Sequence, residues 1–328
     1  MTLITAALGA ILGATMTLVP VAAVAQDYPN KPIRLLIPFT PGGGTDFVSR
    51  IVATALSESL KWQVVPENRP GASGNLAIAQ AAQSSPDGYT IVMGQSDNMA
   101  LGPHLYANVG YDTLKSFVPI IQVSEAPLAL VTNASAIAPI RLANMGDLIA
   151  KGKAGSGISW ATAGNGSMGH MFGEQFKSAA AIKLLQVPYK GAAPAMTDVM
   201  GGQVDVAIMS VPSVLPLVRG GKLTAVAVTT SKRSAMLPTT PTLDEAGVKG
   251  IDAGIWLGLF APVGTPPVIV ARLNTEINKV LQLPEVREKI ISGGATPVGG
   301  SSEGFAAFLR KDYEKWGIIV KESGVKLE

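Results

Sequence analysis

The sequence alternates short apolar runs with amphipathic segments that begin at glycine-rich turns, and this order limits the folds that the chain can adopt. Ile33–Phe39 is a continuous apolar run of the kind found in buried parallel strands, and residues 46–60 then place apolar side chains at helical spacing. A later run, Val204–Ser210, has the same character. Repeated alternation of this kind predicts an α/β protein in which helices cover both faces of a mostly parallel sheet.

The number of these units favours two α/β lobes over a single sheet. In the middle of the chain we expect a strand at Leu128–Ala134 and helices at Ser167–Lys177 and Pro194–Met200. Residues 266–282 and 301–324 have the apolar periodicity of two further helices, and the second opens with serine caps.

Composition excludes several classes of function. The 328 residues include 26 lysines and arginines against 23 aspartates and glutamates, with no basic run, so we expect neither nucleic-acid binding nor a polybasic membrane anchor. The chain has no cysteine and two histidines, His104 and His170, which argues against disulfides and against thiolate or histidine metal sites. We therefore expect no cofactor and no metal.

The first 25 residues resemble an export signal. They carry no charge and end in Ala23-Val24-Ala25, the small-x-small pattern that signal peptidase accepts, with Pro20 nearby as a helix breaker. We expect cleavage after Ala25 and a periplasmic location. The apolar run of about 20 residues is also long enough to remain as a membrane anchor.

Two glycine turns are the candidate binding elements. Residues 40–45 (TPGGGT) follow the strand that ends at Phe39, and residues 162–167 (TAGNGS) follow a second expected strand. Each turn leads into a helix N-terminus, where unpaired backbone N–H groups and the helix dipole favour an anion. The turns lie about 120 residues apart, so by ordinary domain sizes we expect them in different lobes, facing each other across a cleft.

The first turn lacks the features of a nucleotide site. No Gly-Lys-Ser/Thr sequence closes it, and Phe47 occupies the position where a dinucleotide fingerprint has its third glycine. Asp46 would also repel a phosphate at that helix end. Two interpretations of Asp46 remain open: a first-turn charge that favours the helix dipole, or an acceptor that fixes the turn and faces a ligand.

Several long motifs resemble one known family. The stretches "YPNKPIRLLIPFTPGGGTD", "ATAGNGSMGHM", "VPYKGAAPAMTDVMGGQVDVAI" and "WLGLFAPVGTPPVIVARLN" are similar, in order, to the extracytoplasmic substrate-binding proteins of tripartite tricarboxylate transporters, the Bug family. The resemblance implies a type II periplasmic-binding fold, with residues 26–125 and 254–328 in lobe 1, residues 126–253 in lobe 2, and a hinge of two crossing strands. It also implies a monomeric receptor that closes on a small organic acid and delivers it to membrane transporter subunits.

The resemblance implies a set of ligand-binding residues in the two turns. In the first lobe they are Phe39, Thr40, Gly42, Gly43, Gly44, Thr45 and Asp46, and in the second Ala163, Gly164, Asn165, Gly166, Ser167 and His170. Neither turn contains arginine or lysine, which suits a receptor that must release its ligand, because charge-assisted bonds are about twice as strong as neutral ones.

Other candidates are less certain. Ser96, with Asp97 and Asn98 beside it, would lie at the far end of the pocket, where this chain departs from the family pattern. Asp205 is either part of the cleft floor or a turn-capping acid. Trp256 is either core or pocket wall.

Apolar residues in the pocket would favour a larger or aromatic acid over a small hydroxy acid. The candidates for that role are Phe47, Met99, Met168 and Met209.

An enzyme is the alternative class. A periplasmic hydrolase would use Ser167 with His170 as its base, although His170 could equally bond the local backbone at the first helical turn. Residues 300–304 match the G-x-S-x-G nucleophile pattern, but no strand leads into them and a helix cap at Ser301 explains them better.

Overall fold

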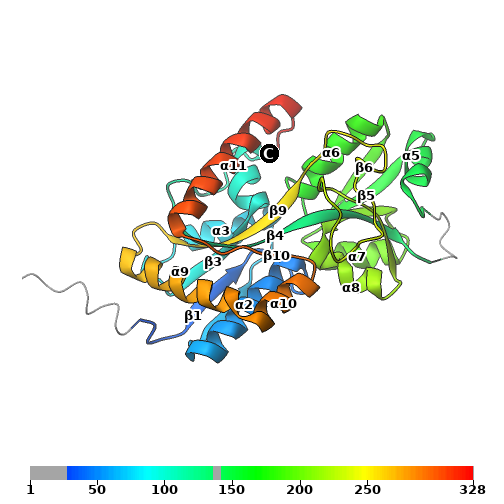
Figure 1. Cartoon of the computed structure of the whole chain (residues 1–328). Coiled ribbons are helices and arrows are strands. Elements are labelled where there is room, and N and C mark those ends of the chain that lie inside the picture. Colours follow the sequence, from blue (N-terminus) through cyan, green and yellow to red (C-terminus); the bar gives the residue numbers. More distant parts are fainter. Residues whose placement is uncertain (1–27, 136–141, 328) are drawn as a thin grey trace, which may run out of the picture.

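The computed structural model describes residues 28–135 and 142–327. The expected signal peptide, residues 1–25, lies outside this part of the chain. The described residues form the two predicted α/β lobes, which lie side by side in Figure 1. No helix among them is both long and apolar enough to cross a bilayer.

The first lobe is built around three parallel strands, with β1 paired to β2 on one side and to β3 on the other. Its regular elements are β1 (Ile33–Ile37), α2 (Gly44–Leu60), β2 (Val64–Asn68), α3 (Asn75–Ala82) and β3 (Thr90–Gln95). Shorter turns follow: η1 (Ala72–Gly74) precedes α3, while η2 (Ser96–Leu101) and α4 (Gly102–Leu105) continue from β3. The η2 turn is π-helical, an irregularity that is frequent at functional sites.

The second lobe repeats this arrangement, with β5 parallel to both β6 and β7. Its strands are β5 (Ile158–Thr162), β6 (Leu184–Pro188), β7 (Val206–Ser210) and β8 (Leu223–Val228). Its helices are α5 (Met145–Lys153), α6 (Met168–Ala180), α7 (Ala192–Met200) and α8 (Val211–Arg219). Alanines and valines of α7, β7 and α8 form a separate apolar cluster inside this lobe.

Two long strands pass between the lobes. β4 (Phe117–Asn133) pairs antiparallel with β9 (Gly254–Pro262) as far as Pro127, and from Leu128 onward it pairs with β7 and β8. One strand thus belongs to both sheets, and β9 connects it back to β3 of the first lobe. The pairing therefore joins the two sheets through β4, and β9 begins where the chain returns to the first lobe.

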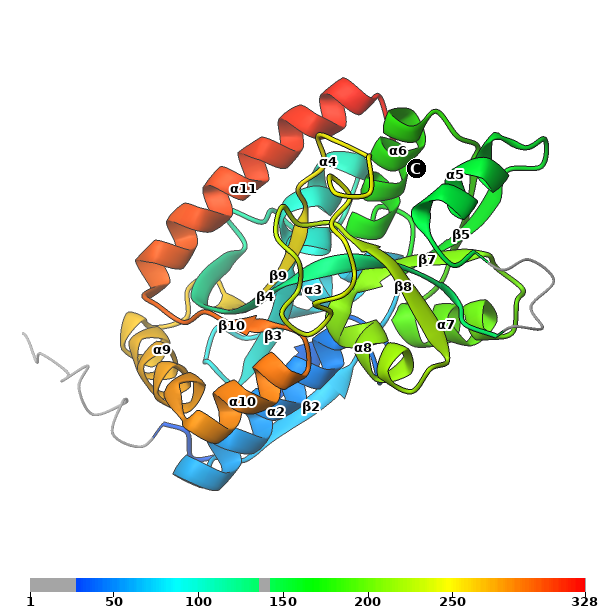
Figure 2. The same ribbon diagram turned by 45° about the vertical axis from the view of Figure 1, so that its right-hand side comes forward.

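The C-terminal segment returns to the first lobe. Its elements are α9 (Pro267–Gln282), α10 (Pro284–Ser292) and α11 (Ser302–Ser323), which Figure 2 shows along the first lobe, with β10 (Thr296–Pro297) beside β4. α2 packs against α9 and α10, and α11 packs along β4 and η2. Phe305 of α11 is buried against Trp256 and Phe260 of β9.

Most predicted elements are confirmed, but one strand is longer than predicted and the helices α5, α8 and α10 were not predicted. The strand predicted at Leu128–Ala134 begins eleven residues earlier, at Phe117. Pro119 and Pro127 interrupt the sequence pattern of a long strand, and two register shifts in the pairing with β9 accommodate the irregular part. α8 was not predicted because it contains Pro216 in its interior, a residue that normally breaks helices.

The packing of α11 on β9 can be tested at Gly258. A methyl group on Gly258 would lie 2.1 Å from Cζ of the buried Phe305 ring, so Gly258→Ala should destabilise the protein by about 1–3 kcal/mol, the usual cost of overpacking. Gly155→Ala is the matched control, since no atom lies within 4 Å of the added methyl. Chemical denaturation of both variants measures the difference, and equal stability would contradict the packing described here.

Candidate functional site

Both glycine turns reach a small cavity between the lobes. Its volume is about 40 Å³, room for a few water molecules. The first lobe contributes Phe39, Gly43, Gly44, Thr45, Gln95 and Asp97 to its lining. The second lobe contributes Ala163 and the start of α6 on one side, and Ser210 and Ser213 on the other.

Asp46 fixes the first turn and does not line this cavity. Its carboxylate accepts hydrogen bonds from the backbone N–H of Gly42 at 3.0 Å, from Arg50 at 2.9 Å and from Asn68 at 2.9 Å. Burial raises the pKa of Asp46, but these hydrogen bonds outweigh it and hold the pKa below its usual value. With both oxygens bonded inside its own lobe, Asp46 orients the backbone that other residues present to the cavity.

Gly44 brings the first turn against the second lobe. Its backbone N–H donates a hydrogen bond to Oγ of Ser213 at 2.8 Å, and Oγ of Ser210 lies 2.9 Å from that of Ser213. A methyl group on Gly44 would approach Ser210 Oγ to 2.8 Å. The N-terminus of α2 is therefore closed by hydroxyl groups of the opposite lobe. Sequence reasoning missed Ser210 and Ser213, which belong to no glycine turn.

The remaining candidates of the first turn surround the cavity without lining it. Thr40 has a buried hydroxyl with no hydrogen-bond partner in the described part of the chain, and Gly191 approaches it closely. Gly42 adopts a positive φ of 82°, which glycine tolerates and which lets its N–H turn toward Asp46.

The second turn is held mainly by backbone bonds. Ser167 caps α6, and its Oγ accepts from the N–H of His170 at 3.2 Å. Nδ1 of His170 accepts in turn from the N–H of Gly166 at 3.1 Å, and burial lowers the pKa of the imidazole. His170 thus bonds the local backbone, the simpler of its two sequence interpretations. Its ring makes no hydrogen bond to Ser167 Oγ in the described structure, so the hydrolase alternative is not supported.

The second turn also contacts the first lobe directly. The carbonyl of Asn165 accepts hydrogen bonds from the hydroxyl of Tyr106 at 2.5 Å and from Ser73. At Gly164, a methyl group would lie 2.6 Å from Ser73 Oγ, so glycine permits this approach. Gly164, Asn165 and Gly166 form a contact between lobes, whereas Ala163 and Ser167 line the cavity.

Asp97 connects the two helix ends, whereas the sequence placed it only beside the candidate Ser96 at the far end of the pocket. The hydroxyl of Thr45 donates to Oε1 of Gln95 at 2.5 Å, and Nε2 of Gln95 donates to Oδ2 of Asp97 at 2.6 Å. The other carboxylate oxygen, Oδ1, accepts from the N–H of Met168 at 2.7 Å. A carboxylate of the first lobe is therefore bound at the N-terminus of α6, where the sequence predicted an anion site.

Asp97 is buried, with 3% of its surface exposed. Burial raises its pKa to about 6, although the hydrogen bonds from Met168 and Gln95 favour the charged form. Among the described residues that line the cavity, Asp97 is the only one with a charged side chain, and no lysine or arginine offsets it. The cavity thus combines neutral donors at one end with a carboxylate at the other.

Two further sequence candidates lie outside the cavity. Ser96 is one residue from Asp97 but faces β9, where its Oγ accepts from the backbone of Trp256 at 3.0 Å. Asp205 precedes β7, at the opposite end of that strand from Ser210, and its carboxylate is bound by Lys151 and Ser159. Neither position favours direct ligand contact.

The aromatic and methionine candidates divide between the cavity and the core. Trp256 is 4% exposed and its Nε1 donates to Asp312 at 2.7 Å, as expected of a core residue. Met168 and Met209 line the cavity, whereas Met99 is buried in the first core cluster. Oγ of Ser301 accepts from the N–H of Gly304 at 3.0 Å, which confirms the helix cap predicted there.

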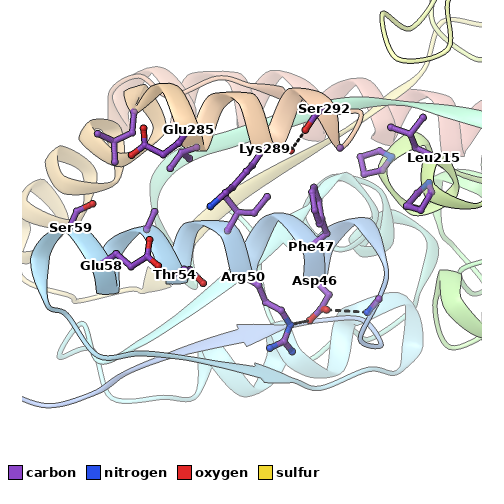
Figure 3. A pocket seen from close by; sticks show the side chains of 18 of the residues that line it. Asp46, Phe47, Arg50, Thr54, Glu58, Ser59, Leu215, Glu285, Lys289 and Ser292 are labelled. Carbon is purple, nitrogen blue, oxygen red and sulfur yellow. Dashed lines mark hydrogen bonds and ion pairs between the residues drawn. The ribbon is translucent and has the colours of Figure 1, made fainter. Parts of the chain in front are cut away.

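A larger groove of about 540 Å³ lies between α2, α10 and α8. Figure 3 shows Phe47 and Leu215 at one end of it and charged side chains, including Lys289 and Glu285, on its flanks. The ion pair of Asp46 with Arg50 lies on its edge. Acidic and basic side chains are mixed along the helices that line this groove, with no group of donors at one place. We therefore favour the smaller cavity as the ligand site. No group of three metal-ligating side chains occurs in the described residues.

The buried charge of Asp97 leads to a prediction about the stability of the fold. Its pKa in the folded state, about 6 against an ordinary value of 3.8, means that folding favours the protonated form, so the associated stability is lost as pH rises through about 6. At pH 7.5, Asp97→Asn should raise the free energy of unfolding by up to about 3 kcal/mol, at 1.36 kcal/mol per pKa unit. The Gln95 amide can rotate to bond the new amide and Thr45.

The advantage of the asparagine variant should shrink as the pH falls from 7.5 to 4.5, because the wild-type carboxyl then becomes protonated. Thermal unfolding of both proteins across this range measures the effect. An asparagine variant that is less stable than wild type at every pH would show that the charge of Asp97 does not oppose folding.

Comparisons with known proteins identify relatives of this chain. Residues 48–325 match the model of the tripartite tricarboxylate transporter family receptor. The chain is 36% identical over 330 residues to Protein BugT of Bordetella pertussis, covering 100% of this chain and 99% of that protein.

Solved structures are similar over nearly their whole length. The periplasmic binding protein BugD has a TM-score of 0.85 and 34% identity, covering 92% of this chain and 100% of its own. Rpa4515 of R. palustris, whose structure contains adipate, has a TM-score of 0.85 and 33% identity, covering 92% of this chain and 99% of its own.

Proposed function

The chain belongs to the tripartite tricarboxylate transporter receptor family, and we propose that it captures a small organic acid between its lobes and delivers it to a membrane transporter of that type. The observation that carries this proposal is the meeting of two helix N-termini, those of α2 and α6, at one interlobe cavity. Backbone N–H groups at such ends bind carboxylates without a cationic side chain.

Release of the ligand is part of this function. The cavity lining contains backbone amides, hydroxyls and the Gln95 amide, and these neutral donors hold a carboxylate more weakly than arginine would. Receptors of this family bind and deliver their ligands, and we propose that this chain catalyses no reaction. The adipate in the related Rpa4515 structure supports a carboxylate ligand.

Binding requires the lobes to move apart and close again. A cavity of about 40 Å³ is far smaller than the roughly 300–1,000 Å³ of ordinary ligand pockets. We propose that lobe 1, residues 26–125 and 254–328, and lobe 2, residues 126–253, rotate about β4 and β9. The change in pairing of β4 between Pro127 and Leu128 supports a hinge there.

Within the proposed site, the residues fall into two groups. Gly43, Gly44, Thr45, Ala163 and Ser167 line the cavity and would contact the ligand. Gly42, Asp46, Gly164, Asn165, Gly166 and His170 would hold the two turns in place around them. Thr40 lies beside the first turn, and its hydroxyl has no partner among the described residues.

Location and assembly state are part of the proposal. We propose a periplasmic receptor whose signal peptide is cleaved after Ala25, acting as a monomer. The similarity to the periplasmic binding protein BugD supports the location.

A carboxylate panel tests the proposed function. We expect at least one aliphatic or aromatic acid, supplied at about 100 times its dissociation constant, to add about 2.7 kcal/mol of stability and raise the melting temperature by several degrees. The corresponding primary amides are the matched controls and should give no shift. If no acid in the panel stabilises the protein, or if the amides do so equally, the proposal is wrong.

Two glycine variants test where the lobes close. Gly44→Ala should weaken binding of the best acid in that panel at least tenfold, because the new methyl would meet Ser210 Oγ at 2.8 Å. Gly155→Ala should bind within about twofold of wild type, since Gly155 lies outside the cavity and its methyl would meet no atom within 4 Å. Isothermal titration calorimetry measures both. Equal affinities for the two variants would refute closure at Gly44.

A further inference from the structure

The two ends of the cavity differ in charge. At α2, the lining consists of the glycine turn, the hydroxyl of Thr45 and the hydroxyls of Ser210 and Ser213. At α6, the N–H of Met168 is already bonded to the carboxylate of Asp97 at 2.7 Å. The protein's own carboxylate thus occupies the N-terminus of α6. At α2 the N–H of Gly44 is bonded only to a neutral hydroxyl of the other lobe, that of Ser213, which a ligand carboxylate can replace when the lobes separate.

Asp97 retains capacity for a further donor. A carboxylate offers about four lone-pair sites, and the N–H of Met168 and the side-chain amide of Gln95 use one on each oxygen. Asp97 also receives a hydrogen bond from its own backbone. The side chain is thereby held in one position on the wall of the cavity, and its remaining lone pairs can accept a hydrogen bond from a ligand.

No other charged side chain among the described residues lines the cavity to offset Asp97. The pKa of the Tyr106 phenol is raised above its ordinary value, mainly by burial and also by the negative charge of Asp97. The tyrosine is therefore uncharged near neutral pH. A ligand with two carboxylates would add further negative charge beside Asp97, whereas a ligand cation would be attracted to it.

We propose that Asp97 is a specificity residue that selects acids bearing a cationic amine, so that the ligand class is the zwitterionic amino acids. The ligand carboxylate binds at the N-terminus of α2, and its ammonium group binds Asp97. This inference rests on the proposed receptor function. Between the two ends the wall is apolar, with Phe39, Ile208 and Ile255, which suits an aliphatic or aromatic side chain.

Matched pairs of ligands test the role of the amine. Leucine is compared with 4-methylpentanoate, phenylalanine with 3-phenylpropanoate, and aspartate with succinate, each pair differing in the ammonium group alone. Isothermal titration calorimetry at pH 7.5 should show at least one amino acid binding tenfold or more tightly than its deaminated partner.

Variants then assign the effect to one side chain. Asp97→Asn should remove the preference, weakening the amino acid at least tenfold while leaving the plain acid equal or tighter. Asp244→Asn removes the same charge from an exposed position outside the cavity and should bind as wild type does. Circular dichroism and thermal unfolding establish that Asp97→Asn is folded.

The outcomes separate the two proposals. If the plain acids bind as tightly as their amino partners, or if Asp97→Asn keeps the preference, the inference is wrong and the receptor function stands. If no member of any pair binds and the wider acid panel also fails, both are wrong.

Discussion

Two helix N-termini meet at one cavity between the lobes, and the placement of these two groups of backbone N–H donors is the constraint on which the site depends. Parallel strands β1 and β5 each deliver a turn at their carboxyl end, and glycine at these turns allows the close approaches to Ser213 and Ser73. The long strand β4 joins both sheets, and in our proposal the two ends approach and separate about it. A site made this way can bind a carboxylate and release it.

The same constraint explains why a buried carboxylate is tolerated. Asp97 is bonded at the N-terminus of α6, where the positive end of the helix dipole favours an anion, and Gln95 links it to Thr45 at the start of α2. Burial still opposes the charge, as the raised pKa of Asp97 shows. A group held against this cost, on the wall of the proposed ligand cavity, has the character of a functional residue.

The sequence predicted the α/β class, the two lobes and both turns, because a glycine-rich segment after an apolar run indicates a turn that follows a buried strand. It could not separate turn residues that line the cavity, such as Gly44 and Ser167, from those that support it, such as His170. Ser96 and Asp97 are adjacent, and only the geometry of the π-helical turn decides which one faces the cavity. Ser213 was missed because α8 contains an internal proline that hides its helical pattern.

The central claim is that backbone amides at the N-terminus of α2 bind the ligand carboxylate. A crystal structure with the acid that stabilises the protein most would test it directly. The account predicts carboxylate oxygens within hydrogen-bond distance, roughly 2.7–3.2 Å, of N–H groups in the segment Gly43 to Thr45. An acid bound instead in the groove between α2 and α10, or held in the cleft without contact to those amides, would contradict it.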